Sequence, residues 1–149
     1  MSVSVIPAQE SPHLASHAAI EILSHSNPLG RVQAAVQYVR SGLPPRAKHR
    51  VLEYIVTHLN ENITNGALAE VAGLSVCHFA RMFKQTVGVS PHCYVLQCRV
   101  KRTQELLADT DMPLSEIAIA AGFSDQSHYT RWFREIAGVT PGSYRWSMR

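Results

Sequence analysis

The sequence predicts an all-helical protein, and three patterns within it support this prediction. Apolar residues recur at intervals of three and four along several segments, which is the periodicity of an amphipathic helix. No segment alternates apolar and polar residues with period two, as a half-buried strand would. One phrase also occurs twice: residues 73–91 read GLSVCHFARMFKQTVGVSP, and residues 122–141 read GFSDQSHYTRWFREIAGVTP. We therefore expect two copies of one helical unit.

Composition and charge limit the class of protein that the chain can be. The 149 residues are 46% hydrophobic, which is enough apolar material for the packed core of one domain. The formal net charge is +3, and 12 of the 14 Lys and Arg residues lie from Arg46 onward, where the repeat is. No apolar run approaches the ~20 residues that cross a bilayer, and three cysteines do not suggest a disulfide framework. We therefore expect a soluble, cytoplasmic protein with no membrane partner, whose mildly basic part is compatible with nucleic acid.

Residues 1–45 are expected to form a short helical extension and a linker. Ser-Pro at 11–12 and Asn-Pro at 27–28 have the order of an N-cap residue followed by a first-turn proline. The second of these helices is expected to stop near Gly42, and the Pro-Pro pair at 44–45 marks the linker. Two short helices can be a loosely packed extension or an arm for dimerisation or partner docking, and the sequence leaves both open.

The first copy of the repeat is expected to follow an amphipathic helix. The apolar residues of that helix recur at intervals of three and four, and it ends near Asn60; they are Val51, Leu52, Ile55, Val56 and Leu59. The copy itself then comprises a short helix with Leu68, Val71 and Ala72, a turn at Gly73, a cap at Ser75, and a helix that buries Phe79, Met82 and Phe83.

A longer helix from Pro91 to Ala108 joins this copy to the second one. The second copy repeats the pattern with a helix over Leu114–Ala121, a turn at Gly122, a cap at Ser124, and a buried stripe of Tyr129, Trp132, Phe133 and Ile136. The first copy opens with Asn65, where the second has an apolar residue, and with Gly66, which lowers helix propensity by up to ~1 kcal/mol. We therefore expect the first copy to be the looser one.

The order of elements in each copy is that of a helix-turn-helix. Each copy has a short helix, a glycine-containing turn and a capped second helix, and in this motif the second helix enters the major groove of DNA. Two copies fall short of the three or more that an α-solenoid needs. Both copies close with Gly-Val-Ser/Thr-Pro and a tyrosine three residues later, which makes the repeat a specific signal.

Residues 46–149 resemble the DNA-binding domain of the AraC/XylS family of transcription regulators. The resemblance runs through LAEVAGLSVCHFARMFKQTVGVSPHCY, the joining CRVKRTQELLADTDMPLSEIA, and IAIAAGFSDQSHYTRWFREIAGVTPGSYR. It implies a homeodomain-like, all-α fold in which two helix-turn-helix subdomains, about 64–90 and 113–138, are joined by a linker helix at about 91–108. It also implies binding of double-stranded promoter DNA through two successive major grooves, with RNA polymerase as a partner.

The second helix of each copy carries the candidate base-reading residues. A helix advances about 100° per residue, so the side chains opposite the two buried aromatic residues of each helix face outward. The candidates are Cys77, His78, Ala80, Arg81, Gln126, Ser127, His128, Thr130 and Arg131, of which Gln126 is implied by the resemblance. Arg81 and Arg131 can each donate two hydrogen bonds to guanine. Hydrogen-bonding side chains are more numerous in the second copy. We therefore expect the DNA half-site under the second copy to be more constrained in base sequence than the half-site under the first.

A second set of residues is suited to contact phosphates rather than bases. Basic side chains and the N-cap residues of helices are common phosphate partners. The candidates are Ser75, Lys84, Lys101, Arg102, Ser124, Arg134 and Arg145. The alternative for each charged residue is a solvated helix face with pairing between residues four apart, and the sequence leaves this alternative open.

Three other classes of function compete with DNA binding. The pairs Cys77-His78 and His92-Cys93 invite a zinc site, but they lack the usual spacing of two to four residues between cysteines, so we expect no metal and no cofactor. Some DNA-repair alkyltransferases carry an AraC-like segment with a reactive Pro-Cys-His-Arg motif, whereas this chain has Pro91-His92-Cys93 and no catalytic constellation, so we expect no enzyme. A protein–protein adaptor without sequence-specific DNA binding remains the alternative.

Overall fold

The computed structural model describes residues 42–149, and these residues form helices with no strand among them. The helices are α3 (Pro45–Thr57), α4 (Asn65–Ala72), α5 (Val76–Val87), α6 (Pro91–Asp109), α7 (Leu114–Ala120), α8 (Gln126–Ala137) and α9 (Pro141–Ser147). The predicted all-α fold is confirmed. The two helices predicted before Gly42 lie outside the described residues. Among the residues described, no helix is long and apolar enough to span a bilayer.

The compact unit begins at Gly42, four residues before the boundary expected at Arg46. Pro45 does not lie in a linker as predicted. It occupies the first turn of α3, where the fixed φ of proline fits and no N–H is needed. Leu43 is buried, and its N–H donates to Oγ1 of Thr86 at 2.7 Å, which ties the segment before α3 to α5. At its other end α3 stops at Thr57, earlier than predicted.

The first unit, α3 to α5 with the start of α6, encloses the first core. Its short helix α4 is capped by Thr64, whose Oγ1 accepts a hydrogen bond from the Ala67 N–H at 3.1 Å. Gly73 ends α4 with a φ of 71°. The core comprises Leu43, Val51, Ile55, Leu68, Ala69, Ala72, Phe79, Met82, Phe83 and Val95. The predicted turn at Gly73 and the three buried residues of α5 are therefore confirmed.

The second unit, α7 to α9 with the rest of α6, has a turn one residue longer than the first. Asp125 is the N-cap of α8, and its Oδ1 accepts from the His128 N–H at 2.8 Å. The prediction that Ser124 is the cap is wrong, because the inserted residue moves the cap one position along the chain. From their caps onward, α5 and α8 match residue for residue.

The buried stripe of α8 is narrower than predicted. Tyr129 and Phe133 are fully buried, but Trp132 is only partly buried and Ile136 is 38% exposed. Tyr129 and Phe133 belong to the second core and Trp132 packs against it, whereas Ile136 lies at the edge of the helix, so the prediction for Ile136 is wrong. The second core comprises Leu96, Val100, Leu107, Ile117, Ala118, Ala121, Phe123, Tyr129 and Phe133.

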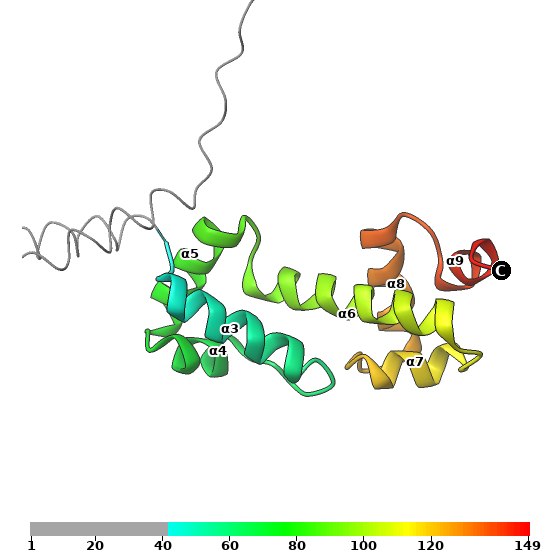
Figure 1. The fold of residues 1–149 in the computed structure, drawn as a ribbon, viewed down its shortest axis with the longest axis horizontal. Coiled ribbons are helices and arrows are strands. Elements are labelled where there is room, and N and C mark those ends of the chain that lie inside the picture. The colour runs from blue at the N-terminus through cyan, green and yellow to red at the C-terminus, as the bar shows by residue number, and fades with distance from the viewer. Residues whose placement is uncertain (1–41) are drawn as a thin grey trace, which may run out of the picture. The chain divides into compact units, whose positions relative to one another are not determined.

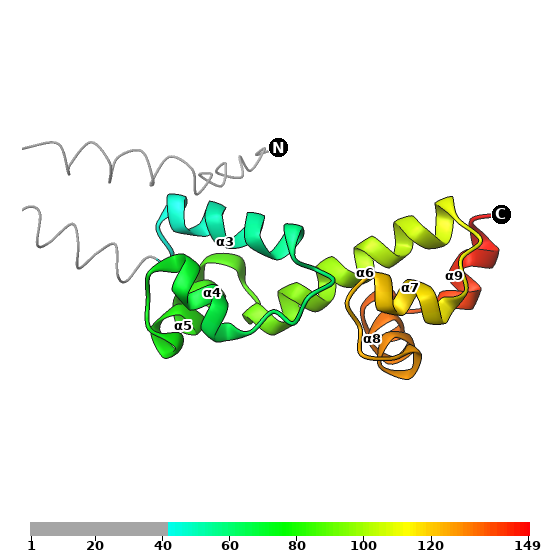
Figure 2. The same cartoon turned by 90° about the horizontal axis from the view of Figure 1, so that it is seen from below.

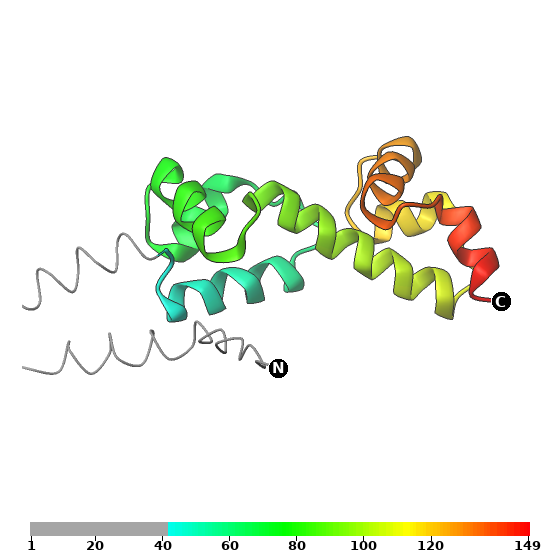
Figure 3. The same ribbon diagram turned by 90° about the horizontal axis from the view of Figure 1, so that it is seen from above.

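The long helix α6 connects the two units (Figure 1). It contributes Val95 to the first core and the next residue, Leu96, to the second. Figures 2 and 3 show that α5 and α8 project to the same side of the domain, while α3 lies along the opposite side. The fold therefore presents both second helices of the repeat on one face.

Candidate nucleic-acid interface

The outward face of α5 carries the residues that the helical spacing predicts. Phe79 and Phe83 are fully buried. Their burial directs Cys77, Arg81 and Lys84 to solvent, and it leaves His78 and Ala80 partly buried at the flanks. Ser75 caps the helix as predicted, since its Oγ accepts from the His78 N–H at 3.4 Å.

The outward face of α8 follows the same rule. Gln126, Ser127, Arg131 and Arg134 are exposed, and His128 and Thr130 are partly buried. An open groove runs along this face and is lined by Gln126, Ser127, Thr130, Arg131, Arg134, Glu135, Gly138 and Thr140. The candidate base-reading residues of the second unit thus lie on one accessible surface. Their contact with DNA stays a prediction.

The cationic side chains on the two faces are unpaired within residues 42–149. The ion pairs of this region join His49 to Glu53, Arg102 to Glu105, and Arg149 to Asp111, and none involves Arg81, Lys84, Arg131 or Arg134. Arg131 therefore does not form an ion pair with a residue four positions away, which was the alternative left open by the sequence. Its guanidinium lies instead 5.3 Å from the centroid of the Trp132 ring. These charges remain available to phosphates or bases.

A chain of hydrogen bonds fixes the start of α8. The Nε1–H of Trp132, which can only donate, lies 3.0 Å from Nε2 of His128, so the ring proton of neutral His128 is on Nδ1. Nδ1 lies 3.2 Å from Oγ of Ser124, which donates to Oδ2 of Asp125 at 3.1 Å. The backbone N–H of His128, and then the Ser124 hydroxyl, lower the pKa of the Asp125 carboxyl. His128, a predicted base reader, has both ring nitrogens engaged within the protein.

The first unit lacks this chain of hydrogen bonds. His78 occupies the position equivalent to His128, and its Nε2 is buried without a hydrogen-bond partner among residues 42–149. Met82 stands where the second unit has Trp132, and a thioether has no hydrogen to donate. Among the side chains of residues 42–149, Ser75 is the one that caps the start of α5.

The candidate phosphate contacts differ in whether their polar groups already have partners within the protein. Lys84, Lys101 and Arg134 are exposed cations that form no ion pair among the described residues. Arg102 is engaged, since its Nη1 lies 2.9 Å from Oε2 of Glu105. Ser75 is the N-cap of α5, and Ser124 lies one residue before Asp125, the N-cap of α8.

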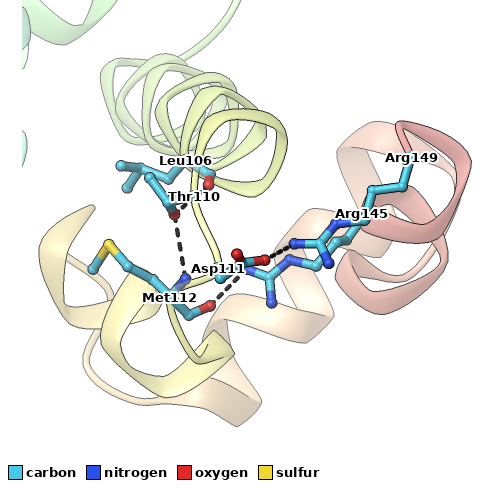
Figure 4. Close-up of polar contacts among 6 residues, drawn as sticks. All are labelled: Leu106, Thr110, Asp111, Met112, Arg145 and Arg149. Carbon is cyan, nitrogen blue, oxygen red and sulfur yellow. Dashed lines mark hydrogen bonds and ion pairs between the residues drawn. The ribbon is translucent and has the colours of Figure 1, made fainter.

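Arg145 has an internal role that the sequence did not suggest. It comes from α9 and is partly buried, and its Nη2 donates to the Met112 carbonyl at 2.6 Å (Figure 4). Arg149 pairs with Asp111 in the same segment. Both arginines thus tie α9 to the connection between α6 and α7, and phosphate contact by Arg145 stays a prediction.

Two residues that position the start of α8 were not predicted to do so from the sequence. Asp125 was passed over as a cap because Ser124 aligned with Ser75, although aspartate is as good an N-cap residue as serine. Trp132 was assigned to the core, against which it does pack, but its Nε1–H also donates to His128, and the N–H of a buried indole usually has such a partner. No group of three or more His, Cys, Asp or Glu between Gly42 and Arg149 is placed to hold a metal ion.

Comparisons with known proteins agree with this geometry. A family model described as a helix-turn-helix domain matches residues 68–147. The chain is 38% identical over 96 residues to "Probable transcriptional regulator LumQ" of Photobacterium leiognathi, which covers 64% of this chain and 39% of LumQ. The chain therefore spans about two fifths of the length of that curated relative.

Two solved structures have the same fold. A transcriptional regulator with an AraC-type DNA-binding domain from Chromobacterium violaceum matches with a TM-score of 0.65 and 26% identity, over 69% of this chain and 92% of that one. The DNA-binding domain of AdpA, a global transcriptional factor solved with a target DNA, matches with a TM-score of 0.64 and 30% identity, over 66% and 89%. The chain belongs to the AraC/XylS family and carries the DNA-binding domain of a transcription regulator.

Proposed function

We propose that this chain regulates transcription by reading two successive major grooves of promoter DNA, one with α5 and one with α8. The observation that carries the proposal is the exposure of unpaired Arg81 and Arg131 at equivalent positions on two helices that project to one side of the domain. The AdpA domain, a structural relative, was solved with a target DNA. RNA polymerase is the proposed protein partner, and the proposed location is the cytoplasm.

The two helices have different roles in this proposal. On α8, Gln126 can pair with adenine and Arg131 with guanine, and each good bidentate contact contributes about 1–3 kcal/mol of discrimination. On α5, Cys77 and Ala80 offer small side chains, and Arg81 reads one guanine. Exposed Lys84 and Arg134 contact phosphates. His128 positions the start of α8 and does not read a base, because both of its ring nitrogens are engaged.

Binding to duplex DNA over a range of salt concentrations tests the proposal. Affinity should fall steeply with salt, because each phosphate contact displaces condensed counterions and adds about 0.9 to the slope of log K against log salt. Footprinting should show two protected major-groove segments about 34 Å apart, one turn of DNA. An affinity that does not change with salt, or a footprint confined to one half-turn, would contradict the proposal.

A further inference from the structure

The turn of the second unit touches the first unit. Gly122 has a φ of 87°, and a Cβ built on it would overlap the carbonyl oxygen of Leu59 and lie 2.9 Å from Nε of Arg99. Leu59 belongs to the connection between α3 and α4 of the first unit, and Arg99 lies near the middle of α6. The backbone of the second unit therefore approaches the backbone of the first more closely than any side chain at residue 122 allows.

Arg99 fills the space between the two units. Its Nε donates to the Leu59 carbonyl at 3.0 Å and its Nη2 to the Glu61 carbonyl at 2.8 Å. Hydrogen bonds from a charged donor are about twice as strong as those between neutral groups. Burial lowers the pKa of Arg99, but the guanidinium stays charged at any pH at which the protein is studied. Arg99 thus holds the connection between α3 and α4 against α6 at the point where Gly122 arrives.

The equivalent glycine of the first unit has no such neighbour. Gly73 also ends the first helix of its unit with a positive φ, of 71°, but nothing lies within 4 Å of a Cβ built there. The turn explains why both positions are glycine. Only at Gly122 is a second reason present, which is contact with the other unit.

We propose that Leu59, Arg99 and Gly122 form a junction that fixes the angle between the two recognition helices and so selects the spacing of the two half-sites. Without the junction α6 would be the main connection, and bending or twisting of α6 would change the relative orientation of α5 and α8. The junction is a second connection away from the axis of α6, and only Phe123 separates Gly122 from the Ser124–Asp125 start of α8. The consequence for spacing rests on the proposed two-groove binding, but the consequence for orientation does not.

The first experiment uses the free protein. Residual dipolar couplings of the α5 and α8 amides should fit one alignment tensor in the unsubstituted chain. Arg99→Gln removes the charged donor, and Gly122→Ala adds the overlapping Cβ. In either variant, the couplings of the first unit and those of the second unit should fit two different alignment tensors. Gly73→Ala is the matched control, because it also places a side chain at a positive φ but adds no contact with the other unit. This variant should still fit a single alignment tensor. Unchanged relative orientation in Arg99→Gln, which leaves the glycine turn intact, would overturn the proposal.

The second experiment measures spacing selectivity on DNA. Duplexes carry the two half-sites at the preferred separation or about 5 bp further apart, half a turn of the helix. Two linked units that engage together gain about 100-fold in affinity, and the gain is lost when geometry forbids joint binding. The unsubstituted chain and Gly73→Ala should show this preference, and Arg99→Gln should reduce it to below about threefold while single half-site affinity stays the same.

The two experiments separate the two proposals. Spacing selectivity that survives in Arg99→Gln would overturn the junction. If the unsubstituted chain fits one alignment tensor but shows no preference for half-site spacing, two-groove binding is overturned, while the fixed orientation of α5 and α8 still holds. Arg99→Lys keeps the charge but loses the forked donor, and it should restore only part of the selectivity, which a general effect of charge on DNA affinity would not explain.

Discussion

The two helix-turn-helix units share one sequence pattern, but their helices begin differently. In the first unit the short helix α4 has a side-chain cap, Thr64, and the recognition helix α5 begins at Ser75 with a long hydrogen bond of 3.4 Å. In the second unit α7 begins after Pro113 with no side-chain cap, and α8 begins at Asp125 within a chain of four hydrogen-bonded side chains. The inserted residue, Ser124, thus gives the start of the second recognition helix hydrogen bonds that the first one lacks.

The largest expected effect tests which recognition helix carries the sequence information. Arg131→Ala should relax base preference under the second unit by about 1–3 kcal/mol, because it removes a bidentate contact from the more polar face. Arg81→Ala should relax preference at one position under the first unit. Selection from a randomised DNA pool measures both. A first half-site with more fixed positions than the second would reverse this assignment.

Removal of one donor should make the second unit resemble the first. Trp132→Phe removes the donor to Nε2 of His128, so this atom would lack a partner as Nε2 of His78 does in the first unit. The substitution should lower the free energy of unfolding by about 1 kcal/mol. Denaturant unfolding measures the change. The matched control is Met82→Leu, which changes the equivalent position without removing a hydrogen bond. An equal loss in the two variants would mean that the indole contributes through packing alone.

The first unit can be tested for the looseness that its sequence predicts. A Cβ at Gly66 would have only Oγ1 of Thr64 near it, at 3.7 Å, and Gly66 has no positive φ. Gly66→Ala should therefore raise the free energy of unfolding by about 0.5–1 kcal/mol, because alanine loses less conformational entropy in a helix than glycine. Amide exchange in α4 and α5 should slow. No change in exchange would indicate that the Thr64 cap already holds this unit.

The smallest expected effect is on pH dependence, because the Asp125 carboxylate is fully exposed. Its hydrogen bonds lower its pKa in the folded state below that in the unfolded state. Its stabilisation is therefore complete above the unfolded pKa and is lost as pH falls through the folded pKa. The amide proton shift of His128 should follow this loss in acid, while that of His78, capped by a serine, should not. If the two amide proton shifts change equally with pH, the Asp125 carboxylate is not the cause of the change.

Much of the fold followed from the sequence because helix periodicity and glycine turns are local signals. The spacing of Phe79 and Phe83 predicted the outward face of α5, and that of Tyr129 and Phe133 predicted the face of α8. The cap of α8 was misassigned because the repeat aligns Ser124 with Ser75, and only the backbone shows on which side of the serine the inserted residue falls. The contact between Leu59 and Gly122 could not be predicted, because it joins residues far apart in sequence through a backbone carbonyl.

The arrangement of α6 has a consequence for how the domain unfolds. Val95 and Leu96 are neighbours in sequence, yet they are buried in different cores, so neither core can be exposed without disturbing the helix that the other one packs against. Heat should therefore melt residues 42–149 in a single cooperative transition, and a fragment that ends before Pro91 would lack Val95, a member of the first core. During synthesis the first core is complete once Val95 has left the ribosome, whereas the second must wait for Phe133. The order of the two units along the chain thus sets which core has all its residues available first during synthesis.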